Sequence, residues 1–168
     1  MHRWINLGRL YLRILKAGSE RRCIKFFAGK TGRRNKYYRM YILTEIEEFL
    51  CKEIVDCAYK VHSQLGPGLL EKIYEACFCH ELNKKEIPFK RQLKLPIIYD
   101  GIEFDEGLKL DVMVDDKIIC EFKAVEIVNP VWQAQIISHL TLTKLHVGFI
   151  LNFNVAIMKD GIRRYCKE

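Results

Sequence analysis

The chain has 168 residues, of which 49% are hydrophobic and 29% are charged, proportions that are ordinary for a globular protein. This length suits one domain with a sizeable core. No apolar run approaches the roughly 20 residues that a helix needs to cross a bilayer, so we expect no membrane-spanning segment.

The net charge of +7 is unevenly distributed along the chain. Residues 1–43 contain twelve Lys or Arg and one acid, whereas residues 44–168 contain sixteen basic and twenty acidic residues. We therefore expect residues 1–41 to be a basic N-terminal extension and residues 42–168 to be the folded domain. Two interpretations of the extension stay open. It is either a flexible basic arm that adds affinity for nucleic acid or a segment outside a natural protein that begins at Met40.

The seven cysteines are odd in number and form no C-x-x-C pattern. Most of them occupy apolar positions of predicted helices and strands, where zinc-site spacing is absent. We expect reduced, buried thiols, as in a cytoplasmic protein.

Helices are predicted at the start of the domain. Thr44 and Glu47 form the T-x-x-E pattern of a capping box, and apolar residues then recur every three or four positions. The sequence Gly66-Pro67-Gly68 ends this helix, and a second one follows as far as Leu82. Glu71 lies in its first turn, a position where glutamate is most often solvated.

From Phe89 the apolar pattern alternates, which predicts strands. Residues 93–99 form the first, with Pro96 indicating an edge or a bulge, and Asp100-Gly101 turns the chain into a short strand at 102–104. Strands at 108–114 and 118–123, a helix at 130–143 with Ala134, Ile137 and Leu140 on its apolar face, a buried strand at 146–153, an Asp160-Gly161 turn and a last strand at 162–166 follow. This order predicts an α/β fold with a mixed central β-sheet flanked by α-helices.

Three charged residues interrupt the apolar strands at 108–114 and 118–123: Asp111, Glu121 and Lys123. If these strands pair as a hairpin, the three side chains can converge on one face, where their burial is costly unless something binds. Two carboxylates suit Mg²⁺, and a nearby lysine can orient a water or neutralise charge on a phosphate. The pattern predicts a metal-dependent phosphodiesterase, although half-exposed strands with solvated charges share it.

Several motifs occur in a specific order: Gly68-Leu69-Leu70-Glu71-Lys72-Ile73-Tyr74, Asp111, Glu121-Phe122-Lys123, Ala134-Gln135 and Leu151-Asn152-Phe153. In this order residues 42–168 closely resemble the GxxExxY protein family, a branch of the PD-(D/E)xK nuclease superfamily. The resemblance implies a restriction-endonuclease-like core with the active site on the strands of Asp111 and Glu121.

The resemblance also implies the ligands of a metal ion, Mg²⁺ or Mn²⁺. Asp111 and Glu121 would bind the metal, with the backbone carbonyl of Phe122 as a third ligand. Glu71 would bind a metal directly or through water. Lys123 would orient or activate the attacking water.

Other positions of the resemblance concern substrate handling and packing. Gln135 matches a catalytic-site glutamine of related exonuclease-like members, but His139 stands where their motif usually has tyrosine. Lys109 stands where many members have arginine and loses bidentate recognition of phosphate. Gly68, Tyr74 and Asn152 are expected to be structural.

We therefore expect a metal-dependent nuclease that hydrolyses phosphodiester bonds in nucleic acid, and we expect that nucleic acid to be DNA and not RNA. The alternative is a catalytically silent nucleic-acid-binding or protein-interaction module on the same fold. The complete set of charged site residues argues against that alternative, and the acidic balance of residues 44–168 argues for it. The sequence leaves open whether the chain forms a homodimer or binds an unidentified protein partner.

Overall fold

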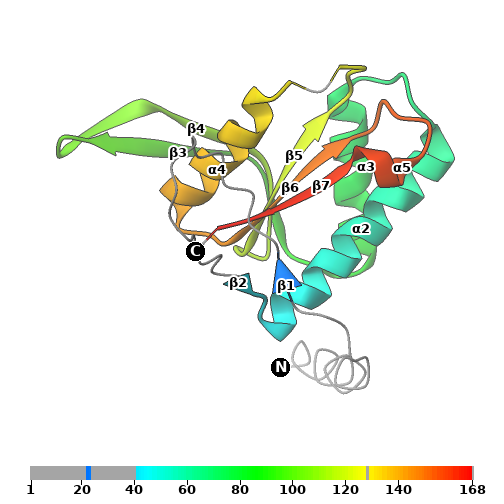
Figure 1. The fold of residues 1–168 in the computed structure, drawn as a ribbon, viewed down its shortest axis with the longest axis horizontal. Helices are drawn as coiled ribbons and strands as arrows, with labels where there is room; N and C mark the ends of the chain where they lie inside the picture. The colour runs from blue at the N-terminus through cyan, green and yellow to red at the C-terminus, as the bar shows by residue number, and fades with distance from the viewer. Residues whose placement is uncertain (1–21, 24–40, 128, 168) are drawn as a thin grey trace, which may run out of the picture.

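The computed structural model describes residues 22–23, 41–127 and 129–167 (Figure 1). Most of the expected basic extension, residues 1–41, lies outside this described part, so its boundary stays a prediction. The elements are β1 (Arg22–Cys23), β2 (Tyr41–Ile42), α2 (Glu45–Leu65), α3 (Glu71–Lys84), β3 (Phe89–Tyr99), β4 (Ile102–Val114), β5 (Ile118–Lys123), α4 (Val131–Thr143), β6 (Val147–Asn152), α5 (Met158–Gly161) and β7 (Ile162–Cys166).

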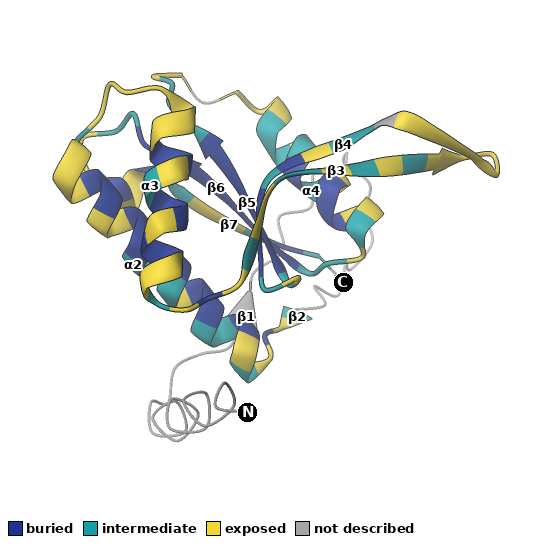
Figure 2. Cartoon of the chain, turned by 180° about the vertical axis from the view of Figure 1, so that it is seen from behind, coloured by how far each residue is buried: buried dark blue, intermediate teal, exposed yellow. Residues whose placement is uncertain are grey.

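A five-stranded sheet in the order β3-β4-β5-β6-β7 forms the centre of the molecule. Strands β5 and β6 are parallel, and the other neighbours are antiparallel. Helices α2 and α3 cover one face and α4 covers the other, as Figures 1 and 2 show from opposite sides. Strands β1 and β2 pair separately. The predicted α/β fold with a mixed central sheet flanked by helices is confirmed.

Two apolar clusters lie on the two faces of the sheet. Alternate residues of β5 divide between them, because successive side chains of a strand point to opposite faces. The larger cluster joins α2 and α3 to the sheet and includes Phe78, Cys120 and Phe122, all less than 2% exposed. The smaller one joins α4 to the sheet and includes Ile119, Ile136 and Leu140. The catalytic candidates lie between these clusters, on strands that are rigidly held from both sides.

Helix α2 begins as the sequence predicts. The Glu47 N–H donates to Thr44 Oγ1 at 3.2 Å, and the Thr44 N–H donates to the Glu47 carboxylate at 2.8 Å, which completes the capping box. The helix ends at Gly66, whose φ of 65° lies in the left-handed region that favours glycine.

Strands β3 and β4 form a long hairpin that projects away from the helices (Figure 1). The strand expected at 102–104 and the one expected at 108–114 are a single strand, β4, which corrects the prediction. A register shift between Leu95 and Ile97 lies opposite Gly107, where an added Cβ would come within 1.7 Å of the Leu95 carbonyl oxygen. The prediction that Pro96 marks an edge or a bulge is confirmed, since β3 is an edge strand and shifts register there.

The apolar face expected for α4 is confirmed in part. Leu140 is fully buried and Ile137 packs against the same cluster, but Ala134 is exposed and Ile136, which was not expected there, is fully buried. Ile136 lies over Gly148 of β6, where an added Cβ would approach Ile136 Cγ1 to 2.8 Å. The missing side chain of Gly148 therefore lets Ile136 pack closely against the sheet.

Two smaller expectations also change. The Asp160-Gly161 turn is instead the end of the short helix α5. Five cysteines are free thiols, and burial raises the pKa of Cys51 to about 11, as expected for unreactive buried thiols. Cys166 is disulfide-bonded, so the expectation of reduced thiols throughout is wrong. None of the described helices is long and apolar enough to cross a bilayer.

Candidate active site

The site lies where β4 separates from β5. Their paired register ends at Val112 and Cys120, beyond which β4 continues with β3 into the projecting hairpin. The Phe122 N–H consequently has no backbone partner on β4 and donates to Asp111 Oδ2 at 2.9 Å. The Asp111 side chain thus takes the place of a backbone acceptor on β4 and lies beside β5. We call the space where β4 and β5 are no longer paired the gap.

The backbone carbonyl of Phe122 faces the same gap. Along an extended strand, the N–H and C=O of one residue point toward the same neighbour, and the next residue points the other way. Lys123 points toward β6, because its carbonyl accepts the Phe153 N–H at 2.8 Å. Phe122 therefore presents its carbonyl oxygen on the edge where Asp111 lies.

Glu121 is buried on β5 with 3% of its surface exposed. Its Oε1 lies 3.1 Å from Nδ1 of His139, which is also buried, on α4. Burial raises the pKa of Glu121, the hydrogen bond to His139 counteracts part of that rise, and the charge of Asp111 adds to it. The charge of Asp111 thus acts on the buried carboxylate of Glu121, and their common role as a site stays a prediction.

Lys123 lies two positions after Glu121 at the end of β5. Its Nζ is 5.9 Å from the centroid of the Trp132 ring on α4, a cation–π distance. Among the described residues it forms no ion pair, so its ammonium group is not neutralised by a carboxylate.

Glu71 is the first residue of α3 and is exposed. Its Oε1 accepts the Ala124 N–H at 3.3 Å, which places the carboxylate just beyond Lys123. The helix N-terminus favours a negative charge at this position. The structure brings Glu71 to the end of β5 and not into contact with Asp111 or Glu121.

Gln135 lies on α4 with a half-buried side chain, and this side chain forms no hydrogen bond with another described residue. Its role in the site stays a prediction. His139, one turn later on the same helix, contacts Glu121. Two α4 side chains therefore lie at the candidate site, His139 beside Glu121 and Trp132 beside Lys123.

Two residues near Asp111 were not found from the sequence. Gln92 Nε2 donates to Glu75 Oε2 at 2.6 Å and lies 3.5 Å from Asp111 Oδ1. Glu75 follows Glu71 by four residues, so the two share one face of α3, and this spacing was the available signal. No sequence pattern pointed to Gln92, because its contact with Glu75 depends on a positive φ of Gln92.

A family model described as the PD-(D/E)XK nuclease superfamily matches residues 48–165. The chain belongs to that superfamily. In this PD-(D/E)XK protein, Asp111 and Glu121-Phe122-Lys123 occupy the strands that flank the gap. No curated protein and no solved structure matches the chain significantly.

Membership of the PD-(D/E)XK superfamily implies a nucleic-acid substrate, and its members are typically metal-dependent. Within the described residues no group of three or more His, Cys, Asp or Glu side chains forms a metal cluster. The ligands that the sequence predicts are the carboxylates of Asp111 and Glu121 and the Phe122 carbonyl, all of them oxygen donors. That set fits Mg²⁺, which binds one or two carboxylates and completes its coordination with water and phosphate.

The G-x-x-E-x-x-Y motif of this PD-(D/E)XK protein has a structural explanation. The Tyr74 hydroxyl donates to the Gly66 carbonyl at 2.7 Å and accepts the Leu69 N–H at 3.0 Å. Its ring stacks on Phe153 at 4.5 Å. Gly68 has a φ of 99°, which an L side chain rarely adopts. Tyrosine and glycine thus shape the loop that delivers Glu71.

Replacing Tyr74 with phenylalanine should lower the free energy of unfolding by about 0.5–1.5 kcal/mol, because the Gly66 carbonyl and the Leu69 N–H, which are only partly buried, lose their hydrogen-bond partner. The loop before α3 should then hold Glu71 less firmly. Chemical denaturation measures the first effect, and hydrogen exchange of the Ala124 amide measures the second. Tyr59→Phe is the matched control, since Tyr59 is exposed. An unchanged free energy of unfolding would contradict this role of the Tyr74 hydroxyl.

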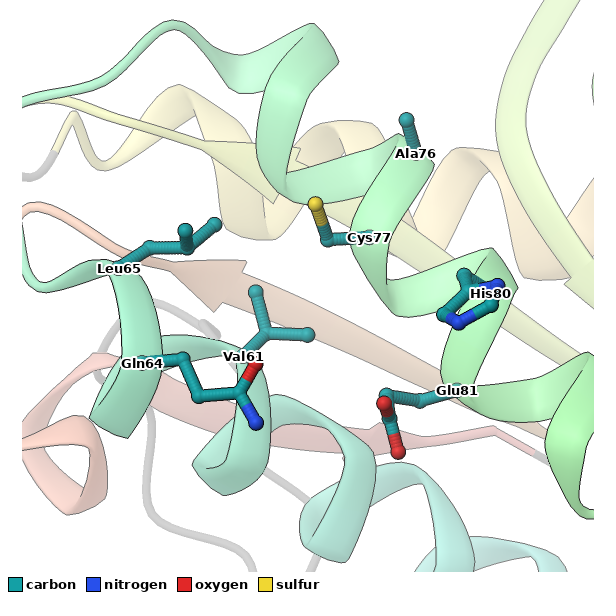
Figure 3. A pocket seen from close by; sticks show the side chains of 7 residues that line it. All are labelled: Val61, Gln64, Leu65, Ala76, Cys77, His80 and Glu81. Carbon is teal, nitrogen blue, oxygen red and sulfur yellow. The ribbon is translucent and has the colours of Figure 1, made fainter.

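A separate hollow lies between α2 and α3 (Figure 3). It contains none of the residues that the sequence predicts for the site. Side chains of both helices line it: Val61, Gln64, Leu65, Ala76, Cys77, His80 and Glu81. The candidate site is therefore not this hollow but the open gap between β4 and β5.

Proposed function

We propose that the protein is a nuclease of the GxxExxY family that uses Mg²⁺ or Mn²⁺ to hydrolyse phosphodiester bonds in DNA. One observation carries the proposal. Asp111 bridges the gap to the Phe122 N–H, and its charge acts on the buried carboxylate of Glu121. An apolar protein interior holds two such carboxylates at a cost, and a cation removes that cost.

Asp111, Glu121 and the Phe122 carbonyl would hold the ion. The ion supplies Lewis acidity, which favours ionisation of the attacking water and stabilises charge on the phosphate. Glu121 would bind the ion through Oε2, while the contact of Oε1 with His139 would orient the carboxylate.

Lys123 would orient the attacking water or neutralise charge on the scissile phosphate. Its position over Trp132 keeps the ammonium beside the gap without a competing carboxylate. Glu71 would act at the end of β5, directly or through water, on a second ion or a substrate-bound water. Gln135 would contact substrate, since no described residue engages its amide.

A silent nucleic-acid-binding or protein-interaction module remains the second candidate. The acidic balance of residues 44–168 supports it, because nucleic-acid-cleaving domains usually present a basic surface. The choice of DNA before RNA rests on the resemblance to the GxxExxY family and not on a contact within the site.

The test is cleavage of labelled DNA and RNA, linear and circular, in Mg²⁺, in Mn²⁺ and in EDTA. The nuclease proposal requires cleavage with a metal, none in EDTA and none by a Glu121→Gln chain. Cutting of circular DNA would show internal cleavage. Cleavage of RNA alone would overturn the DNA assignment, and binding without cleavage in every metal would favour the silent module.

A further inference from the structure

Gln92 has a backbone conformation that a strand residue seldom adopts. Its φ is 49°, in the left-handed region, although it lies within β3 and is not a glycine. For an L residue this conformation costs roughly 1–2 kcal/mol. Such strain persists only where surrounding contacts hold it, and it often accompanies a functional role.

The left-handed angle brings two neighbouring side chains to one carboxylate. In a regular strand, successive side chains such as those of Arg91 and Gln92 point to opposite faces. Here Arg91 Nε donates to Glu75 Oε1 at 2.9 Å, and Gln92 Nε2 donates to Glu75 Oε2 at 2.6 Å. Glu75 is 3% exposed, so both of its oxygens are occupied inside the protein.

The same amide also faces Asp111. Gln92 Nε2 lies 3.5 Å from Asp111 Oδ1, while Asp111 Oδ2 accepts the Phe122 N–H. Both neighbours of the amide are carboxylate oxygens, which accept hydrogen bonds, so the nitrogen and not the oxygen must face them. The contact with Oδ1 is long, which leaves that oxygen open to a cation.

We propose that Gln92, held in its strained conformation by Glu75 and Arg91, is the positioning residue for Asp111. Glu75 anchors the amide, and the amide limits the rotation of the Asp111 carboxylate, so that Oδ2 stays on the Phe122 N–H and Oδ1 faces the gap. This inference deepens the proposed function, on which its consequence for metal binding rests. The positioning itself does not require a metal.

The first readout is hydrogen exchange of the Phe122 amide in the metal-free chain. Gln92→Gly removes the amide and relieves the strained angle. Gln92→Met removes the amide but retains the side-chain length and the strain. Both variants should increase Phe122 exchange about tenfold, because the Asp111 acceptor becomes mobile. Both variants lose the hydrogen bond to Glu75, but Gln92→Gly should unfold at a higher temperature than Gln92→Met, because glycine alone relieves the strained angle.

Ile98→Gly is the matched control. Ile98 lies on the same strand and is 71% exposed, and it has no positive φ. Glycine at this position should lower the unfolding temperature slightly and leave Phe122 exchange unchanged. The two glycine substitutions on β3 therefore differ in their expected effect on Phe122 exchange, which only Gln92→Gly should increase.

The second readout is calorimetric binding of Mn²⁺. Both Gln92 variants and Glu75→Gln should weaken binding about 10- to 100-fold, as is usual when a residue that orients a metal ligand is lost. If the wild type binds no Mn²⁺, even with a non-hydrolysable DNA duplex present, while Phe122 exchange still responds, the positioning role holds and the proposed function fails. If Gln92→Met leaves Phe122 exchange unchanged, the positioning role is overturned, whatever the metal does.

Discussion

Replacing Asp111 with asparagine is expected to reduce metal-dependent cleavage by about 10²–10³-fold, the usual loss when one electrostatic group of a catalytic site is removed. Asparagine keeps the shape of the side chain and retains an oxygen that can accept the Phe122 N–H. The free energy of unfolding should therefore change by less than about 1 kcal/mol. Initial rates of cleavage and chemical denaturation of the same samples measure the two effects.

Asp105→Asn is the matched control for Asp111→Asn. Asp105 lies on the same strand, β4, but is exposed on the projecting hairpin. Its replacement removes the same charge without touching the gap, so cleavage should stay at the wild-type rate. Equal activity of the Asp111→Asn chain and the wild type would exclude Asp111 from the site.

Replacing Glu121 with glutamine should reduce cleavage about as much as Asp111→Asn does. Unusually for a buried position, it should also raise the free energy of unfolding near neutral pH. Burial is the main reason that the pKa of Glu121 is raised above its ordinary value of 4.5. The folded chain thus binds this proton more tightly than the unfolded chain. Ionisation then costs the folded state free energy, and glutamine removes that cost while preserving a hydrogen bond to His139.

The sign of the pH dependence follows from the raised pKa. Below about pH 4.5 the carboxyl is protonated in both states, and the wild type and the glutamine variant should differ little. As pH rises through the folded-state pKa, the wild type should lose stability relative to the variant. Asp111 strengthens this trend, whereas His139 and Lys123 oppose it.

Thermal unfolding of both chains between pH 4 and pH 8 measures this difference. Glu103→Gln, an exposed substitution on β4, should show no such divergence. A Glu121→Gln chain that is less stable than the wild type at pH 7 would mean that the ionised pair with His139 stabilises the fold. Glu121 would then be structural.

Structural features that depend on neighbouring residues could be predicted from the sequence. The capping box of Thr44, the Asp100-Gly101 turn and the alternation of β5 around Glu121 depend on neighbouring residues, and each occurs as expected. The alternation around Asp111 does not, because Leu110 joins the α4 cluster while Val112 joins the cluster on the other face. The positions of Asp111 and Glu121 on adjacent strands were nevertheless predicted correctly. Their roles as ligands remain proposals.

Features that depend on tertiary contacts could not be predicted from the sequence. The burial of Ile136 depends on the missing side chain of Gly148, which no periodicity of the helix itself reveals. The contact of Gln92 with Glu75 depends on a left-handed angle in a strand, which alternation excludes. The separation of β4 from β5 creates the gap that Asp111 bridges, and register alone does not predict where two strands part.

Calorimetric titration of Mn²⁺ into the wild type and into an Asp111→Asn/Glu121→Gln double variant tests the central claim most directly. The nuclease proposal predicts binding by the wild type, with release of protons below neutral pH as Glu121 ionises, and no binding by the double variant. The titration is repeated with a non-hydrolysable DNA duplex present, because substrate phosphate can complete the coordination of the ion. Equal binding by both chains, or none by the wild type even with DNA, would contradict a metal site at Asp111 and Glu121.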